Sequence, residues 1–245
     1  MTSKTTTTGR VRVAIAGAGI LALCSAGAAK AQSLTVLPVN IEMAPGQMST
    51  TMTVINQGTT ETSVQLRAFA WSQKDGKEVL TASDDVVASP PAATIAPGAT
   101  QVVRLVLRKA PGAQEATYRM LLDQIPPPAA PGTVRISLRL SIPVFAEPAA
   151  RAVAHMQYHV ENTGGKAWLV AVNDGGRHDT VRSLALTGAD GAAIKTENST
   201  SPYVLAGATS RWAIDGSLPA SGSVHLTGTA DGGSMDQSVP VAAHN

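Results

Sequence analysis

The sequence predicts an all-β protein of two sandwich domains that follow a removable export segment. Small and β-branched residues dominate the chain, whereas aromatic residues make up only 3% of it. Turn-forming glycine, proline and asparagine recur at intervals of about ten residues between short apolar runs. No long segment has the apolar period of about 3.6 residues that an amphipathic helix shows. Together these observations favour strands throughout.

Residues 1–31 have the three parts of a cleavable signal peptide. Three cations form its basic start: Lys4, Arg10 and Arg12. Residues 13–23 form an apolar run that is too short to span a membrane. Ala29-Lys30-Ala31 fits the small-x-small cleavage rule, so the mature chain is expected to begin at Gln32 in the periplasm. Leu23 argues against lipid attachment at Cys24, because it is bulky and directly precedes that cysteine.

Cleavage changes the charge and the cysteine content of the chain. Four of the 19 basic residues lie in residues 1–31, which leaves 15 against 17 acidic residues, a net charge of −2. This charge gives no support for nucleic acid or an anionic membrane as partner. The only cysteine leaves with the signal, so an exported fold without disulfides must be held by core burial and hydrogen bonds.

Residues 32–147 are expected to form the first sandwich. Pro38 interrupts its first strand and marks an edge strand, because proline cannot donate to a central ladder. Both faces of residues 64–71 are partly apolar, as in a central strand. About seven strands over roughly 115 residues match the size of an immunoglobulin-like domain. The strands are predicted at residues 33–43, which Pro38 breaks in two, and at residues 50–55, 64–71, 101–107, 118–122 and 134–142.

Residues 134–142 alternate strictly between apolar and polar side chains, which predicts a β-strand with one apolar face. Prolines precede this strand, and Pro143 is expected to end it. Either it is an ordinary half-buried strand, or it is an edge strand that offers its apolar row to another protein. In the second case its arginines keep it from pairing with copies of itself. The apolar row is Val134, Ile136, Leu138, Leu140 and Ile142.

Residues 148–245 carry a second set of short strand patterns, richer in glycine and less apolar. They predict a second, weaker β-sandwich that follows a hinge at Phe145 to Pro148. The predicted strands are residues 153–161, 168–172, 181–187, 203–205, 211–214, 224–229 and 239–242.

Spaced motifs along nearly the whole mature chain resemble the periplasmic pilus (fimbrial) assembly chaperones of chaperone–usher systems. The likeness is to the PapD-like superfamily, and within it to the archaic branch. Each motif alone is weak, but their order makes the resemblance specific. The motifs are Val54-x-Asn56-x-Gly58, Gln65-x-Arg67-x-Phe69-x-Trp71-x-Gln73, Ser89-Pro-Pro91, Ile95-x-Pro97-Gly98, Tyr118-Arg119, Ser141-x-Pro143-x-Phe145, Trp168-x-Val170-x-Val172 and Tyr203-x-Leu205-x-Gly207.

The resemblance implies two immunoglobulin-like domains set at an angle like a boomerang. It implies a chaperone that caps a pilus subunit by donor-strand complementation and delivers it to an outer-membrane usher. Residues 134–142 would be the donor strand, with the apolar row filling the subunit groove. Neither a cofactor nor a small-molecule substrate is implied, and the free chaperone is a candidate for self-association.

Classical members of the family hold the carboxylate at the end of the subunit with one arginine and one lysine. The matching positions here are near Pro38 and at Pro143, and neither residue is a cation. The substitutes to be tested as carboxylate anchors are Arg139, Arg67 and Arg119.

Glu115 and Asp231 match two members of the ion cluster that joins the domains in classical chaperones. Glu147 stands where that cluster has its arginine. Arg104 is therefore a candidate for the missing partner, or else an ordinary buried cation. Arg104, Glu115 and Asp231 are all expected to be structural charges.

Three other functions are alternatives to the chaperone. An enzyme is disfavoured because no serine or cysteine nucleophile stands beside an evident base. A copper carrier would use Met43, Met48 and Met52, which are expected to be core residues instead. A structural pilus subunit or surface adhesin remains the alternative, although the strand to be donated lies mid-chain here. No metal site is expected, and the five histidines are expected to be exposed: His155, His159, His178, His225 and His244.

Overall fold

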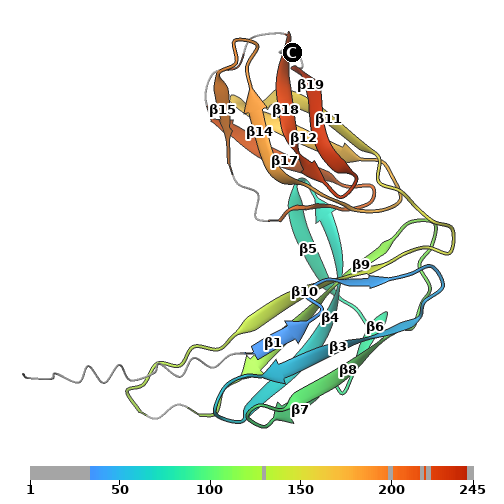
Figure 1. Cartoon of the computed structure of the whole chain (residues 1–245), viewed down its shortest axis with the longest axis vertical. Helices are drawn as coiled ribbons and strands as arrows, with labels where there is room; N and C mark the ends of the chain where they lie inside the picture. The colour runs from blue at the N-terminus through green and yellow to red at the C-terminus, as the bar shows by residue number, and fades with distance from the viewer. Residues whose placement is uncertain (1–33, 129–130, 198–200, 216–217, 219–221, 242–245) are drawn as a thin grey trace, which may run out of the picture. The chain divides into compact units, whose positions relative to one another are not determined.

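A computed structural model describes residues 34–128, 131–197, 201–215, 218 and 222–241, and these residues form strands and turns without a helix (Figure 1). The predicted signal peptide and its cleavage site lie outside the described residues. Within the described ranges, no helix is long and apolar enough to cross a membrane.

The strands between residues 34 and 146 form two sheets. One sheet has the order β1-β3-β8-β6, and the other has the order β2-β10-β9-β4-β5, with β7 also paired to β4. Pro38 separates β1 from β2, so the expected break in the first strand is present, and its two pieces lie at the edges of different sheets. The bounds are β1 Leu34–Leu37, β2 Ile41–Met43, β3 Ser49–Asn56, β4 Thr62–Lys74, β5 Lys77–Ala82, β6 Val86–Ser89, β7 Ala92–Ile95, β8 Thr100–Leu107, β9 Ala116–Ile125 and β10 Arg139–Ala146.

The core of this part lies between the two sheets, where alternate residues of each strand point inward. Val54 on β3, Leu105 on β8 and Leu122 on β9 are fully buried there. The opposite face of the β10-β9-β4 sheet carries polar and aromatic residues instead, because side chains alternate between the two faces. That outward face positions the charged residues described below.

Strand β10 begins five residues later than the alternating pattern predicts. The predicted strand was residues 134–142, whereas the ladder with β9 starts where Arg139 lies opposite Asp123. Continuing that register would place residues 134–136 opposite Pro126, Pro127 and Pro128, which have no N–H to donate. Residues 134–138 therefore belong to no strand in this structure.

Pro143 lies inside β10 and does not end it, which corrects the sequence-based expectation. The backbone N–H of Gln124 donates to Leu138 O at 2.9 Å, so even-numbered residues of β10 turn their backbone groups toward β9. Pro143 is odd-numbered and turns its missing N–H away from β9. On that side the parallel pairing with β2 begins only at Val144, so Pro143 removes no ladder bond.

The strands after residue 155 form one closed sheet in the order β11-β12-β17-β15-β14-β18-β19, beside a short β13-β16 pair. A single parallel pair, Val160 with Val241, closes it. Leu169, Leu186 and Leu226 are fully buried inside. The bounds are β11 Met156–Thr163, β12 Lys166–Asn173, β13 Asp179–Thr180, β14 Arg182–Thr187, β15 Ala193–Thr196, β16 Tyr203–Val204, β17 Thr209–Asp215, β18 Gly222–Ala230 and β19 Gly233–Val241.

Candidate functional site

The apolar row of residues 134–142 leaves the core gradually along its length. Ile142 is only 4% exposed and belongs to the core, and Leu140 is half-buried against the same core. The exposed fraction then rises to 38% at Leu138, 90% at Ile136 and 95% at Val134. Ile142 is thus a core residue and not a side chain free for a partner, which corrects its predicted role. The other end of the row is exposed.

The edge of β10 is open beside this row. Strand β2 pairs only with Val144 to Ala146, so the backbone of Arg139 and Ser141 on that side has no strand partner among the described residues. Before Arg139, the Leu138 N–H donates to the side-chain Oε1 of Gln124 at 3.2 Å. This side chain takes the place of a strand neighbour and ends the ladder. An extended peptide could therefore pair with this edge.

Two of the predicted anchor arginines share one carboxylate on the outward face of the sheet. Arg67 Nη2 lies 2.7 Å from Asp123 Oδ2, and Arg139 Nε pairs with Asp123 Oδ1. Burial raises the pKa of Asp123, but hydrogen bonds from Arg139 and Arg67 outweigh this and hold the pKa below its ordinary value. Two cations on one carboxylate leave a net charge of about +1 there. Both guanidinium groups remain exposed at their outer sides.

The third predicted anchor, Arg119, is buried and already paired. It lies on β9 directly opposite Pro143, the position where classical relatives have a cation. Its Nη2 is 2.9 Å from Glu78 Oε1, and its guanidinium lies 3.6 Å above the ring of Trp71. A buried, neutralised and stacked arginine is structural, because freeing it would leave Glu78 unpaired. The structure therefore separates Arg119 from Arg67 and Arg139.

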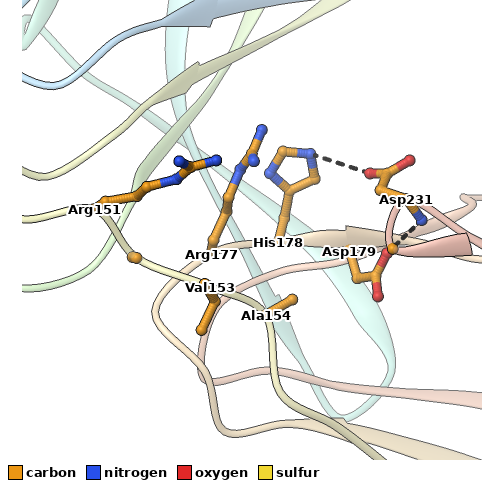
Figure 2. Close-up of a pocket in the computed structure, with 9 residues that line it drawn as sticks. Arg151, Val153, Ala154, Arg177, His178, Asp179 and Asp231 are labelled. Carbon is orange, nitrogen blue, oxygen red and sulfur yellow. Dashed lines mark hydrogen bonds and ion pairs between the residues drawn. The ribbon is translucent and has the colours of Figure 1, made fainter.

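Glu115 is fully buried, and its partner is a histidine and not Arg104. Its Oε2 accepts a hydrogen bond from the backbone N–H of His178 at 3.0 Å and lies 2.7 Å from His178 Nδ1. His178 Nε2 is in turn 4.0 Å from Asp231, and Figure 2 shows the imidazole beside that carboxylate. His178 is 4% exposed, so the expectation that all five histidines are exposed is wrong at this position.

Arg104 lies away from this cluster, on the exposed face of β8. Its Nη2 donates a 3.4 Å hydrogen bond to the Ser49 hydroxyl. The idea that Arg104 replaces the missing arginine, or is a buried cation, is therefore wrong. Alternation explains this: Val103 and Leu105 point into the core, so Arg104 must point outward.

Arg177 is the cation of the ion cluster around Glu115, in place of the arginine that is absent at position 147. Its Nη2 is 2.7 Å from Glu42 and 3.7 Å from Glu147, and its Nε is 3.7 Å from Glu115. Glu147 stands where classical relatives have an arginine, and it pairs here with Arg177, which lies in the connection between β12 and β13. No regular pattern marks Arg177 and His178, since both lie in the loop before β13.

Aromatic residues complete the same region. The Phe145 ring stacks on His178 with centroids 3.6 Å apart, and Trp71 meets Tyr203 edge-on at 5.4 Å. Gln73 adds two hydrogen bonds, donating to Tyr203 O at 2.7 Å and accepting from the Leu205 N–H at 2.9 Å. The last residues of β10 are therefore held on both of their faces.

The cavity drawn in Figure 2 is lined in part by charged side chains. Its lining residues include Arg151, Arg177, His178, Asp179 and Asp231. Asp179 accepts hydrogen bonds from the backbone N–H groups of Thr180 and Asp231, and Asp231 accepts one from the Thr180 hydroxyl. In the described part of the chain, no group of three His, Cys, Asp or Glu side chains could hold a metal ion.

The methionines weighed as copper ligands do not form a shared site. Met43 and Met52 are each 1% exposed and belong to the core of the first two sheets, whereas Met48 is at the surface. Met43 and Met52 act as apolar filling, as expected from the sequence, whereas the expectation of a core position is wrong for Met48.

The family model for the N-terminal domain of PapD, described as pili and flagellar-assembly chaperones, matches residues 33–152. Residues 33–152 therefore belong to the PapD-like family of pilus-assembly chaperones. This class agrees with the predicted fold, with two β domains and without a helix in the described residues. No curated protein sequence gives a significant match.

Several solved structures share this fold at low sequence identity. One is the CsuC–CsuE chaperone–tip adhesion subunit pre-assembly complex from archaic Csu pili of Acinetobacter baumannii, with 22% identity, 87% of this chain and 100% of that chain covered, and a TM-score of 0.63. The YadV chaperone has 15% identity, coverages of 84% and 98%, and a TM-score of 0.61. The Salmonella enterica SafA pilin–SafB chaperone complex has 17% identity, coverages of 85% and 95%, and a TM-score of 0.59.

Proposed function

We propose that the chain is a periplasmic chaperone that binds, folds and caps a pilus subunit by lending it a strand, and then delivers it to an outer-membrane usher. The observation that carries the proposal is the apolar row, which begins in the chaperone's own core at Ile142 and continues into solvent as far as Val134. Subunits that lack a strand expose an apolar groove and unpaired backbone groups. A row that extends an existing core beyond its own sheet matches that need.

The proposal assigns the groove-filling role to Val134, Ile136 and Leu138, with Leu140 at the boundary. Burying three aliphatic side chains contributes at most roughly 5–9 kcal/mol, before the entropy cost of ordering residues 134–138. Backbone pairing along the open edge at Arg139 and Ser141 adds register and specificity. No catalytic step belongs to this function.

Arg67 and Arg139 are the preferred anchors for the carboxylate at the end of the subunit. Both are exposed and share the carboxylate of Asp123 on β9; Arg139 lies on β10, whose edge is open, and Arg67 reaches the same carboxylate from β4. An incoming carboxylate can therefore add to the site without leaving a buried cation unpaired. Arg119 is excluded from this role because it is stacked and neutralised.

The proposal also divides the chain. Residues 1–31 are the export signal, cleaved after Ala31, and residues 32–147 form the domain that captures the subunit. Residues 148–245 form the second domain. The end of β10 at Ala146 and the start of β11 at Met156 support this division.

Co-purification from the periplasm tests the capture role. Ile136→Asp should abolish recovery of the subunit, because a carboxylate cannot enter a groove that excludes water without a partner. The matched control is Ser137→Asp, which places the same charge on the next residue and on the opposite face. Equal recovery with both variants would sink the assignment, and unchanged circular-dichroism melts would exclude misfolding as the cause.

A further inference from the structure

Strand β5 is the outermost strand of its sheet and has one free edge. It pairs only with β4 among the described residues, and each of its six residues from Lys77 to Ala82 is exposed. Two of them are large and apolar, Val79 at 39% and Leu80 at 40% exposure. An exposed edge with an apolar centre is a template for pairing with another strand.

The backbone orientation of β5 follows from a hydrogen bond at its end. Ser83 N–H donates to Ala68 O at 3.4 Å, in the same register that places Ala82 opposite Phe69. Antiparallel ladders alternate, so the odd-numbered residues of β5 turn their N–H and C=O groups toward β4. The backbone groups of Glu78, Leu80 and Ala82 therefore face away from the sheet and are free to pair.

We propose that the chain forms a two-fold symmetric dimer by antiparallel pairing of β5 with β5 of a second copy, centred on Leu80. In this register each outward-facing residue meets another, which gives roughly six backbone hydrogen bonds. Leu80 lies on the two-fold axis and contacts its own copy. On the opposite face of the ribbon, Val79 lies against Thr81 of the second chain.

The side chains of this register suit a second copy as the occupant, because Leu80 meets Leu80 and Val79 meets Thr81. The register places Glu78 opposite Ala82, so no like charges face each other directly. Glu78 is also paired with Arg119 of its own chain at 2.9 Å. Sliding the register by two residues would place Glu78 against Leu80 and lose a pair of hydrogen bonds. Sliding it by one would turn the free backbone groups away from each other.

The contact is small, so it belongs with weak and transient interfaces. It uses none of the residues 134–142 and is independent of the proposed function. Sedimentation velocity over a wide range of concentrations should show reversible dimerisation of the processed chain. Leu80→Lys should weaken association by roughly tenfold or more, because it places like charges directly opposite each other.

Two control variants separate this edge from the rest of the surface. Val102→Lys adds the same charge at another exposed apolar position, on β8, and should leave the dimer unchanged. Ile136→Asp should also leave it unchanged, since the dimer does not use the capture row. A wild-type chain that is monomeric at all concentrations, or a Leu80→Lys variant that associates normally, would overturn the proposal.

Thiol cross-linking tests the register. The processed chain has no cysteine, because Cys24 lies within residues 1–31. With a short bifunctional thiol reagent, Leu80→Cys should cross-link to its own copy. Ala82→Cys should not, because the two copies of residue 82 would be ~13 Å apart along the strands. Cross-linking at residue 82 without cross-linking at residue 80 would refute the register.

Discussion

Replacing Glu115 with alanine should destabilise the protein more than any other single loss of charge described above. The carboxylate is fully buried and within hydrogen-bonding distance of His178 twice, at 2.7 Å and 3.0 Å, and it lies 3.7 Å from Arg177 Nε. Removing one partner of such a buried set leaves the others desolvated and unpaired, which costs ~3–5 kcal/mol. For a chain of this size, that loss lowers the melting temperature by roughly 6–20 °C.

Glu42→Ala is the matched control, because Glu42 also pairs with Arg177, at 2.7 Å, but is largely exposed. Exposed pairs contribute about 0–1 kcal/mol, so this variant should melt near the wild type. Urea unfolding followed by circular dichroism measures both free energies. Equal losses for Glu115→Ala and Glu42→Ala would refute the reasoning that burial, and not the ion pair itself, sets the cost.

Three further predictions concern the same domain. Ile142→Ala should cost ~2–5 kcal/mol in urea unfolding, because it opens a cavity in the core. Arg104→Ala should change stability by less than ~0.5 kcal/mol in the same assay, because the side chain is exposed. Asp123 has a lowered pKa, so its stabilising effect is complete above its ordinary value and is lost as the pH falls through the lowered value. Asp123→Asn should flatten this part of the acid-unfolding curve below about pH 4, and an unchanged curve would contradict the pairing with Arg67 and Arg139.

The apolar face of residues 134–142 could be predicted from alternation alone, because side-chain period depends only on the chain itself. Where the strand begins could not, because this depends on its neighbour. Strand β9 ends at Ile125, and the prolines that follow it cannot pair with residues 134–136. Ile142 was assigned to the partner for the same reason: the pattern shows one apolar face but not where the chain's own core stops.

The charged residues around the buried Glu115 were predicted only in part. Glu115 and Asp231 were identified by resemblance, but His178 and Arg177 lie in a loop without periodicity, and their contacts come from chain segments distant in sequence. Strand β5 was also missed, since its residues are all exposed and show no buried face. A turn at Asp75 and Gly76 was the available signal, because a tight turn after a strand predicts a second strand.

Hydrogen–deuterium exchange across residues 133–141 tests the central claim most directly. In the free chaperone, the amides of residues 134–137 should exchange at nearly the rate of an unstructured chain, since they belong to no strand. In the complex with the subunit, alternate amides of this segment should become strongly protected as they join the subunit's sheet. Protection already present in the free chain, or none gained in the complex, would contradict donation of this strand.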